Sequence, residues 1–181
     1  EIKNISLLGS KGSGKTTLAE AMLYECGVIK RRGTVEAKTT TCDYFPVEKE
    51  YGYSVFSTVF YAEFLNKKLN VIDCPGSDDF VGNAITALNV TDTGVILIDG
   101  QYGVEVGTQN IYRTCEQLKK PIIFAINQLD GEKADFDNSL LQLREHYGNK
   151  VVPIQFPINC GPSFNSMIDV LLMKQYSWGP E

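Results

Sequence analysis

Short apolar runs alternate with segments of helical pattern along most of the chain. The apolar runs lie at residues 3–8, 53–60, 68–73, 94–99, 121–127 and 151–156. The helical patterns lie at residues 17–23, 80–88, 108–118, 139–147 and 164–174. This alternation predicts an α/β fold with a mostly parallel central sheet and helices on both faces. A polar bend near residues 66–67 separates two of the runs, so we expect a hairpin there and one antiparallel edge strand.

A polar stretch from Lys30 to Glu50 shows no clear apolar period. We interpret it as a long, mobile loop. Loops of this length inside a compact domain are more often functional than idle, so the stretch is a candidate for a functional segment.

Glycine is concentrated between the first apolar run and the first helical pattern. The segment and the residue after it read Gly9, Ser10, Lys11, Gly12, Ser13, Gly14, Lys15, Thr16 and Thr17. The pattern G-x-x-x-x-G-K-[ST] is typical of a phosphate-binding loop, in which backbone N–H groups surround an anion. Lys15 would add a positive charge near the β- and γ-phosphates, and the Thr16 hydroxyl would ligate Mg²⁺. These residues predict nucleotide binding.

Two further motifs stand at the ends of predicted strands. The first reads Asp73, Cys74, Pro75 and Gly76, and the second reads Asn127, Gln128, Leu129 and Asp130. The Asp73 carboxylate can hold Mg²⁺ through water, and the Gly76 N–H can approach a γ-phosphate. Asp130 offers two acceptors to the adjacent N1–H and N2–H₂ donors of guanine, which adenine lacks. We therefore expect selection of guanine over adenine.

Length, charge and cysteine content limit the domain count, the partners and the cellular compartment that we expect. The chain has 181 residues, enough for one substantial domain, and a net charge of -5, which argues against a free-standing DNA-binding module. Its five scattered cysteines predict reduced thiols in the cytoplasm, and no apolar run reaches membrane-spanning length. We expect no contact with free DNA or with a membrane, and a monomeric domain.

The three motifs together resemble those of the regulatory GTPases, and their context resembles the translational GTPases, most closely elongation factor G. Residues 73–80 resemble the family's D-T-P-G-H-x-D-F, and residues 48–55 resemble its switch segment E-x-E-R-G-I-T-I. Residues 103–109 are similar to its G-V-E-P-Q-[ST], and residues 164–178 are similar to the segment that opens its inserted subdomain.

The resemblance implies a GTP-binding domain that uses GTP or GDP with Mg²⁺ and that acts on the ribosome. Thr16 and Ser54 would ligate the metal together with Asp73 through water. Residues 1–156 would form a GTP-binding domain without its final strand and helix, and residues 157–181 would begin the inserted subdomain. We expect a translocation-type role for the whole protein.

Several positions depart from the family pattern. Ser77 stands where the family has the histidine that positions the attacking water, and the switch arginine and threonine become Tyr51 and Ser54. Gln128 replaces the lysine whose stem covers one face of the guanine. Loss of a positioned catalytic group typically costs a factor of about 10²–10⁴ in rate. With Lys15 and Ser77 as its catalytic residues, the chain is expected to hydrolyse GTP slowly.

Two alternatives stay open from the sequence. One is a GTP-dependent factor that binds or protects ribosomes without useful hydrolysis. The other is an ATP-using kinase or ATPase with the same phosphate loop, which Asp130 disfavours.

Overall fold

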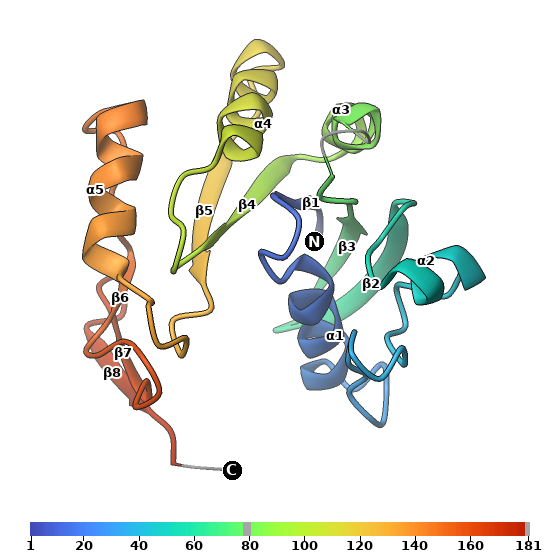
Figure 1. Cartoon of the computed structure of the whole chain (residues 1–181), viewed down its shortest axis with the longest axis horizontal. Coiled ribbons are helices and arrows are strands. Elements are labelled where there is room, and N and C mark those ends of the chain that lie inside the picture. The colour runs from blue at the N-terminus through green and yellow to red at the C-terminus, as the bar shows by residue number, and fades with distance from the viewer. Residues whose placement is uncertain (78–80, 180–181) are drawn as a thin grey trace. The chain divides into compact units, whose positions relative to one another are not determined.

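A computed structural model describes residues 1–77 and 81–179 of the chain. Thirteen helices and strands lie within these ranges, and Figure 1 shows them. The strands are β1 (Ile2–Gly9), β2 (Thr58–Phe64), β3 (Lys67–Asp73), β4 (Thr93–Asp99), β5 (Ile122–Asn127), β6 (Gln155–Pro157), β7 (Ser166–Asp169) and β8 (Lys174–Ser177). The helices are α1 (Lys15–Glu25), α2 (Pro46–Tyr51), α3 (Val81–Val90), α4 (Val106–Gln117) and α5 (Phe136–Tyr147).

The main sheet has the strand order β2-β3-β1-β4-β5. Strand β1 pairs in parallel with β3 and β4, whereas β2 pairs antiparallel with β3 through the turn at Leu65 and Asn66. The predicted α/β fold, its mostly parallel sheet and its antiparallel edge are therefore confirmed. Parallel neighbours bring the carboxyl ends of β1 and β3 to the same edge, where the phosphate-loop motif and the Asp73 motif both begin.

Successive residues of β1 pack on opposite faces of the sheet. Leu7 joins a buried cluster with Ala19 and Leu23 of α1. On the other face, Gly94 of β4 lies against Leu8 and against Leu88 of α3. Helices thus cover both faces, as the alternation of apolar runs and helical patterns predicts.

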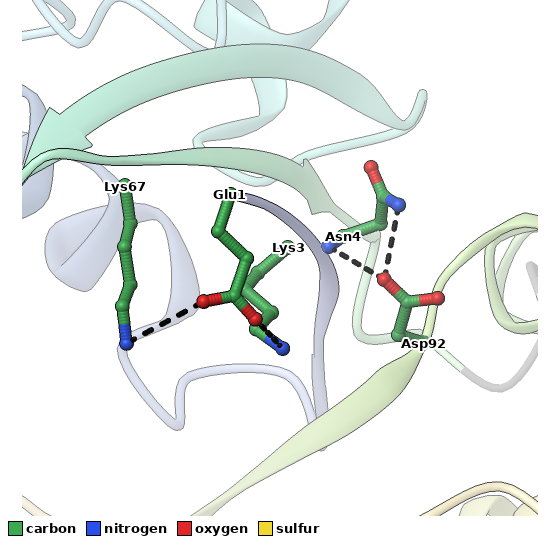
Figure 2. Close-up of polar contacts among 5 residues, drawn as sticks. All are labelled: Glu1, Lys3, Asn4, Lys67 and Asp92. Carbon is green, nitrogen blue, oxygen red and sulfur yellow. Dashed lines mark hydrogen bonds and ion pairs between the residues drawn. The ribbon is translucent and has the colours of Figure 1, made fainter.

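The amino end of the sheet carries polar contacts, which Figure 2 shows. The carboxylate of Glu1 pairs with Lys3 at 2.7 Å and lies 4.0 Å from Lys67. Asn4 donates to the Asp92 carboxylate from its backbone N–H at 2.9 Å and from its side chain at 3.0 Å. These two donors hold the pKa of Asp92 below its ordinary value. They tie the turn before β4 to β1, at the end opposite the glycine-rich motif.

The chain divides into two compact units. The first comprises residues 1–97 and 106–125, and the second comprises residues 98–105 and 126–181. The second contains α5 and an antiparallel sheet of order β6-β7-β8. The predicted domain boundary between residues 156 and 157 does not coincide with this division, and it stays a prediction.

The predicted helix at residues 164–174 is wrong. Residues 166–169 and 174–177 form β7 and β8, which pair with each other. The Asp169 carboxylate accepts the N–H of Leu172 at 2.8 Å, and Met173 adopts a left-handed φ of 52°. A side-chain acceptor and a left-handed residue make a tight turn, and pairing with β6 then outweighs the helical spacing of apolar residues.

Other boundaries also differ from the prediction, and three of these differences follow. The expected loop at residues 30–50 contains α2, whose first position is Pro46. Strand β2 begins at Thr58 instead of residue 53, and β6 begins at Gln155 instead of residue 151. The predicted helix start at Phe80, with Asp78 and Asp79 before it, lies outside the described residues.

Candidate functional site

The glycine-rich motif connects β1 to α1 in a tightly wound loop. Gly9 has a φ of 138°, and a Cβ there would lie 2.5 Å from the carbonyl oxygen of Leu97. Gly14, the residue before α1, is left-handed with a φ of 91°. Both positions favour glycine, because an added side chain would clash at one and be strained at the other. The loop therefore presents its backbone at the N-terminus of α1, the arrangement that binds phosphate.

Lys15 is the first residue of α1 and is only 7% exposed. Its ammonium donates to the carbonyl oxygens of Gly9 at 3.0 Å and Ser10 at 2.9 Å, and to the Ser13 hydroxyl at 3.5 Å. These acceptors hold a buried positive charge inside the loop. An anion bound by the loop would meet that charge directly.

The Thr16 hydroxyl, in the first turn of α1, contacts side chains from two other segments. It donates to the Asp73 carboxylate at 2.9 Å and lies 3.1 Å from the Ser54 hydroxyl. Ser54 in turn donates to the carboxylate of Asp43 at 2.6 Å. The three residues that the sequence assigned to a metal, Thr16, Ser54 and Asp73, are thus brought together.

Asp73 is buried, with 2% of its surface exposed. Burial raises the pKa of Asp73 to about 7, against the opposing effects of the Thr16 hydrogen bond and the charge of Lys15. Its Oδ1 atom is buried without a hydrogen-bond partner. Burial likewise raises the pKa of Asp43 above its ordinary value, opposed by the hydrogen bond from Ser54.

This oxygen cluster fits a magnesium ion. Mg²⁺ prefers oxygen ligands and in nucleotide sites is bound by one or two protein groups together with phosphates and water. The unsatisfied Oδ1 of Asp73 and the adjacent hydroxyls of Thr16 and Ser54 supply such groups. No three His, Cys, Asp or Glu side chains are grouped as metal ligands within residues 1–77 and 81–179. The fit therefore depends on hydroxyls and one carboxylate.

Gly76 lies directly against the phosphate loop. A Cβ on this glycine would lie 2.4 Å from the ammonium of Lys15 and 2.8 Å from the backbone nitrogen of Lys11. Only a glycine lets the strand end after β3 approach the loop this closely. Cys74 and Pro75 before it are buried, and burial raises the pKa of the Cys74 thiol to about 12, so the thiol is inert. Ser77 follows, half-buried.

The N-Q-L-D motif lies in the second unit, at the end of β5. Gly100 donates its N–H to the Asn127 carbonyl at 2.8 Å, and Gly161 donates to the Leu129 carbonyl at 2.7 Å. Gln128 adopts a left-handed φ of 57°, and Leu129 is buried. Asp130 is exposed. The loop is therefore fixed by backbone hydrogen bonds while its last carboxylate faces outward.

Sequence reasoning missed the residues that support this site. Asp43 anchors Ser54, and the buried carboxylate of Glu48 accepts the N–H groups of Val55 and Phe56 at 3.0 and 3.1 Å. Glu20 of α1 accepts the N–H groups of Gly33 and Thr41. Glu20 and Asp43 stand in no motif, and Glu48 opens the switch-like segment at residues 48–55, where the resemblance assigned it no role. The partner of Asp43 is a side-chain hydroxyl, and those of Glu48 and Glu20 are backbone N–H groups, all of which only the folded chain brings near.

Comparison with known proteins identifies the family. The family model described as elongation factor Tu GTP binding domain matches residues 1–175. The chain belongs to that family. It is a GTP-binding domain of the translational GTPases, related to the G domain of elongation factor G. The α/β fold of this domain also agrees with a crystal structure from Thermus thermophilus that is 36% identical, with a TM-score of 0.92 over 98% of this chain and 27% of that one.

Curated relatives of this translational GTPase domain come from bacteria and a yeast. An elongation factor G-like protein of Thermotoga maritima is 35% identical over 98% of this chain and 25% of its own length. Elongation factor G of Mycoplasma genitalium is 33% identical over 96% of this chain and 25% of its own length. A mitochondrial ribosome-releasing factor 2 of Scheffersomyces stipitis is 33% identical over 99% of this chain and 22% of its own length. The chain thus spans about a quarter of the relatives it matches.

No helix within the described ranges is both long enough and apolar enough to cross a bilayer.

Proposed function

We propose that this GTP-binding domain serves an elongation factor G-like protein that acts on the ribosome in the cytoplasm, in a translocation-type role. The observation that carries the proposal is the cluster of Lys15, Thr16, Ser54 and Asp73. It joins the phosphate loop to the segment at residues 48–55, which resembles the family's switch segment, and to the Asp73 motif, which resembles the family's D-T-P-G-H-x-D-F. Such a cluster can couple the γ-phosphate of GTP to the position of those segments.

In the proposed site, Lys15 and the N–H of Gly76 hold the γ-phosphate. The hydroxyls of Thr16 and Ser54 ligate Mg²⁺, and Asp73 binds it through water. When bound, the ion neutralises charge on the phosphates. The loop residues from Gly9 to Thr17 surround the phosphates. The Asp130 carboxylate accepts hydrogen bonds from guanine, with Asn127 and Gln128 beside it.

We also propose that GTP turnover is slow, even on the ribosome. Ser77 stands where relatives of this family have a histidine that positions the attacking water. A serine hydroxyl is shorter and has no ring nitrogen, so it orients water less directly. Lys15 still stabilises negative charge on the γ-phosphate. Binding is therefore retained while the chemical step is weakened.

The test is GTP turnover by the full-length protein, with and without ribosomes, compared with its Ser77→His variant. We expect weak stimulation by ribosomes in the wild type and a rise of about 10²-fold in the variant, the size typical of one positioned catalytic group. Binding of GTP by both proteins serves as the control. Robust ribosome-stimulated hydrolysis by the wild type would refute the slow-turnover proposal.

Ser77 also favours a second function, a factor that binds or protects ribosomes in the GTP state without useful hydrolysis. Cosedimentation of the full-length protein with ribosomes discriminates the two. The second function requires retention in GTP and release in GDP, together with no effect of GTP on movement of transfer RNA. A translocation-type role requires that movement.

A further inference from the structure

Two side-chain contacts join the phosphate loop to residues 53–54. The first is the hydroxyl pair of Thr16 and Ser54 at 3.1 Å. The second lies one residue earlier, where the ammonium of Lys11 lies over the ring of Tyr53, 3.6 Å from its centroid. The two contacts connect the same two segments. The first belongs to the proposed metal site, and the second is outside it.

Residues close to Tyr53 in the sequence fix the position of its ring. Gly52 ends α2 with a left-handed φ of 70°, and its N–H donates to the Glu48 carbonyl at 2.7 Å. The Tyr51 ring lies 5.9 Å from the Tyr53 ring, and the Glu48 carboxylate accepts the N–H of Val55 at 3.0 Å. Lys11 therefore meets an aromatic face whose position is already fixed.

The strength of this contact is set by partial burial. Tyr53 is half-buried and Lys11 is exposed, which places the pair between the weak and the strong cation–π interactions. Both groups belong to the protein, so the contact requires no phosphate. It can hold the segment with either GDP or GTP in the loop.

We propose that the Lys11–Tyr53 contact is a latch that positions Ser54 against the phosphate loop and slows the release of GDP. In the GTP form, the γ-phosphate and the metal at Ser54 hold the same segment. In the GDP form that γ-phosphate is absent, and the latch is a side-chain contact outside the metal site that does not depend on it. Loss of the latch therefore accelerates release of GDP more than release of GTP. Tyr53 is a positioning residue.

The test measures the release of fluorescent methylanthraniloyl-GDP and its GTP counterpart from the full-length protein by stopped flow, without ribosomes. We expect Tyr53→Leu to accelerate GDP release about fivefold, the factor that corresponds to a half-exposed cation–π contact. GTP release should change by less than half as much. Tyr53→Phe keeps the ring and should restore the slow GDP release.

A double-mutant cycle with Lys11→Met separates the latch from a general effect on folding. If the ring acts through Lys11, Tyr53→Leu has no further effect on GDP release in the Lys11→Met background. A matched control is Tyr61→Leu, which removes another aromatic partner of a lysine, Lys68 at 4.6 Å, on the β2–β3 hairpin. It should leave both rates unchanged.

Three results would each overturn the latch: unchanged GDP release in Tyr53→Leu, equal effects of Tyr53→Leu with and without Lys11, or equal rates for the leucine and phenylalanine variants. The inference depends on nucleotide binding and on the proposed role of Ser54. It does not depend on hydrolysis or the ribosome, so these measurements can fail while the proposed ribosomal function stands, and the reverse.

Discussion

At the scale of single residues, the Thr16 hydroxyl carries more contacts than its place in a sequence motif suggests. It bonds to Asp73 and lies beside Ser54, within a buried setting. Replacing it with the isosteric valine leaves the Asp73 carboxylate without that donor. A buried group that loses its partner typically costs about 1–3 kcal/mol.

We predict that Thr16→Val lowers nucleotide affinity and reduces its dependence on Mg²⁺, because one proposed ligand is gone. Titration of fluorescent GDP with and without Mg²⁺ measures this. The control is Thr86→Val, which removes a hydroxyl bonded to the Gly82 carbonyl at 2.9 Å on the exposed surface of α3. Unchanged Mg²⁺ dependence in Thr16→Val would contradict the assignment of this ligand.

The carboxylate of Asp73 predicts a pH dependence of stability. Its pKa is about 7 in the folded domain, above the ordinary value of an aspartate. The folded state therefore binds more protons than the unfolded state between about pH 4 and pH 7, and stability from this group falls as pH rises through that range. Between these limits the loss is on the order of 3 kcal/mol.

Asp73→Asn should remove this dependence when Mg²⁺ and nucleotide are absent. Amide hydrogen exchange of β1 and β3 at about pH 5 and pH 7 measures it, after correction for the intrinsic rate. We expect the wild type to lose protection at the higher pH relative to the variant. Added Mg²⁺ and GDP should reverse the trend, because they favour the ionised carboxylate.

At the scale of elements, the end of β3 meets the phosphate loop through Gly76. A methyl group there would collide with the Lys15 ammonium and with the backbone of Lys11. We predict that Gly76→Ala forces the two segments apart and lowers GTP affinity at least about tenfold, the equivalent of about 1.4 kcal/mol.

Gly82→Ala is the matched control for this substitution, since nothing lies within 4 Å of a Cβ at Gly82. Within α3 the change to alanine should stabilise the helix by up to about 1 kcal/mol. Calorimetric binding of a non-hydrolysable GTP analogue compares the two variants. Equal affinities would show that Gly76 is not tightly packed against the loop.

Helix α2 is coupled to the Ser54 segment by the buried carboxylate of Glu48, which accepts the N–H groups of Phe45, Val55 and Phe56. We predict that Glu48→Ala exposes these N–H groups and accelerates their hydrogen exchange by about 10-fold or more, since each lost acceptor costs about 1–3 kcal/mol. Glu50→Ala, on the same helix and exposed, should leave them unchanged. Equal exchange in both variants would exclude this coupling.

At the scale of the whole molecule, the residues assigned to the phosphates and to the base belong to different units of the chain. A substitution at the base-recognition residue should therefore leave the contacts within the phosphate loop unchanged. We predict that Asp130→Asn reduces GDP affinity by about 10²-fold or more, because an amide replaces one acceptor with a donor facing guanine. Competition by GDP, xanthosine diphosphate and ADP measures it. Unchanged guanine preference would remove Asp130 from base recognition.

The sequence alone determined the contiguous features of this protein. The turns of the glycine-rich loop, the strand before each motif and the alternation that predicts an α/β sheet depend on neighbours within a few residues. Local backbone preference and hydrophobic periodicity therefore predict such features directly. The family resemblance has the same origin, because its motifs are contiguous.

Only the tertiary structure decided which distant residues meet. Asp43 binds Ser54, Glu48 caps the segment that carries it, and Lys11 lies over Tyr53, yet none of these pairs has a periodic signal. The segment at residues 164–174 shows the same limit, since its apolar spacing fits a helix while pairing between β6, β7 and β8 makes it a sheet. Hydrogen bonds and packing between remote segments outweigh local propensity, and they form only when the chain has folded.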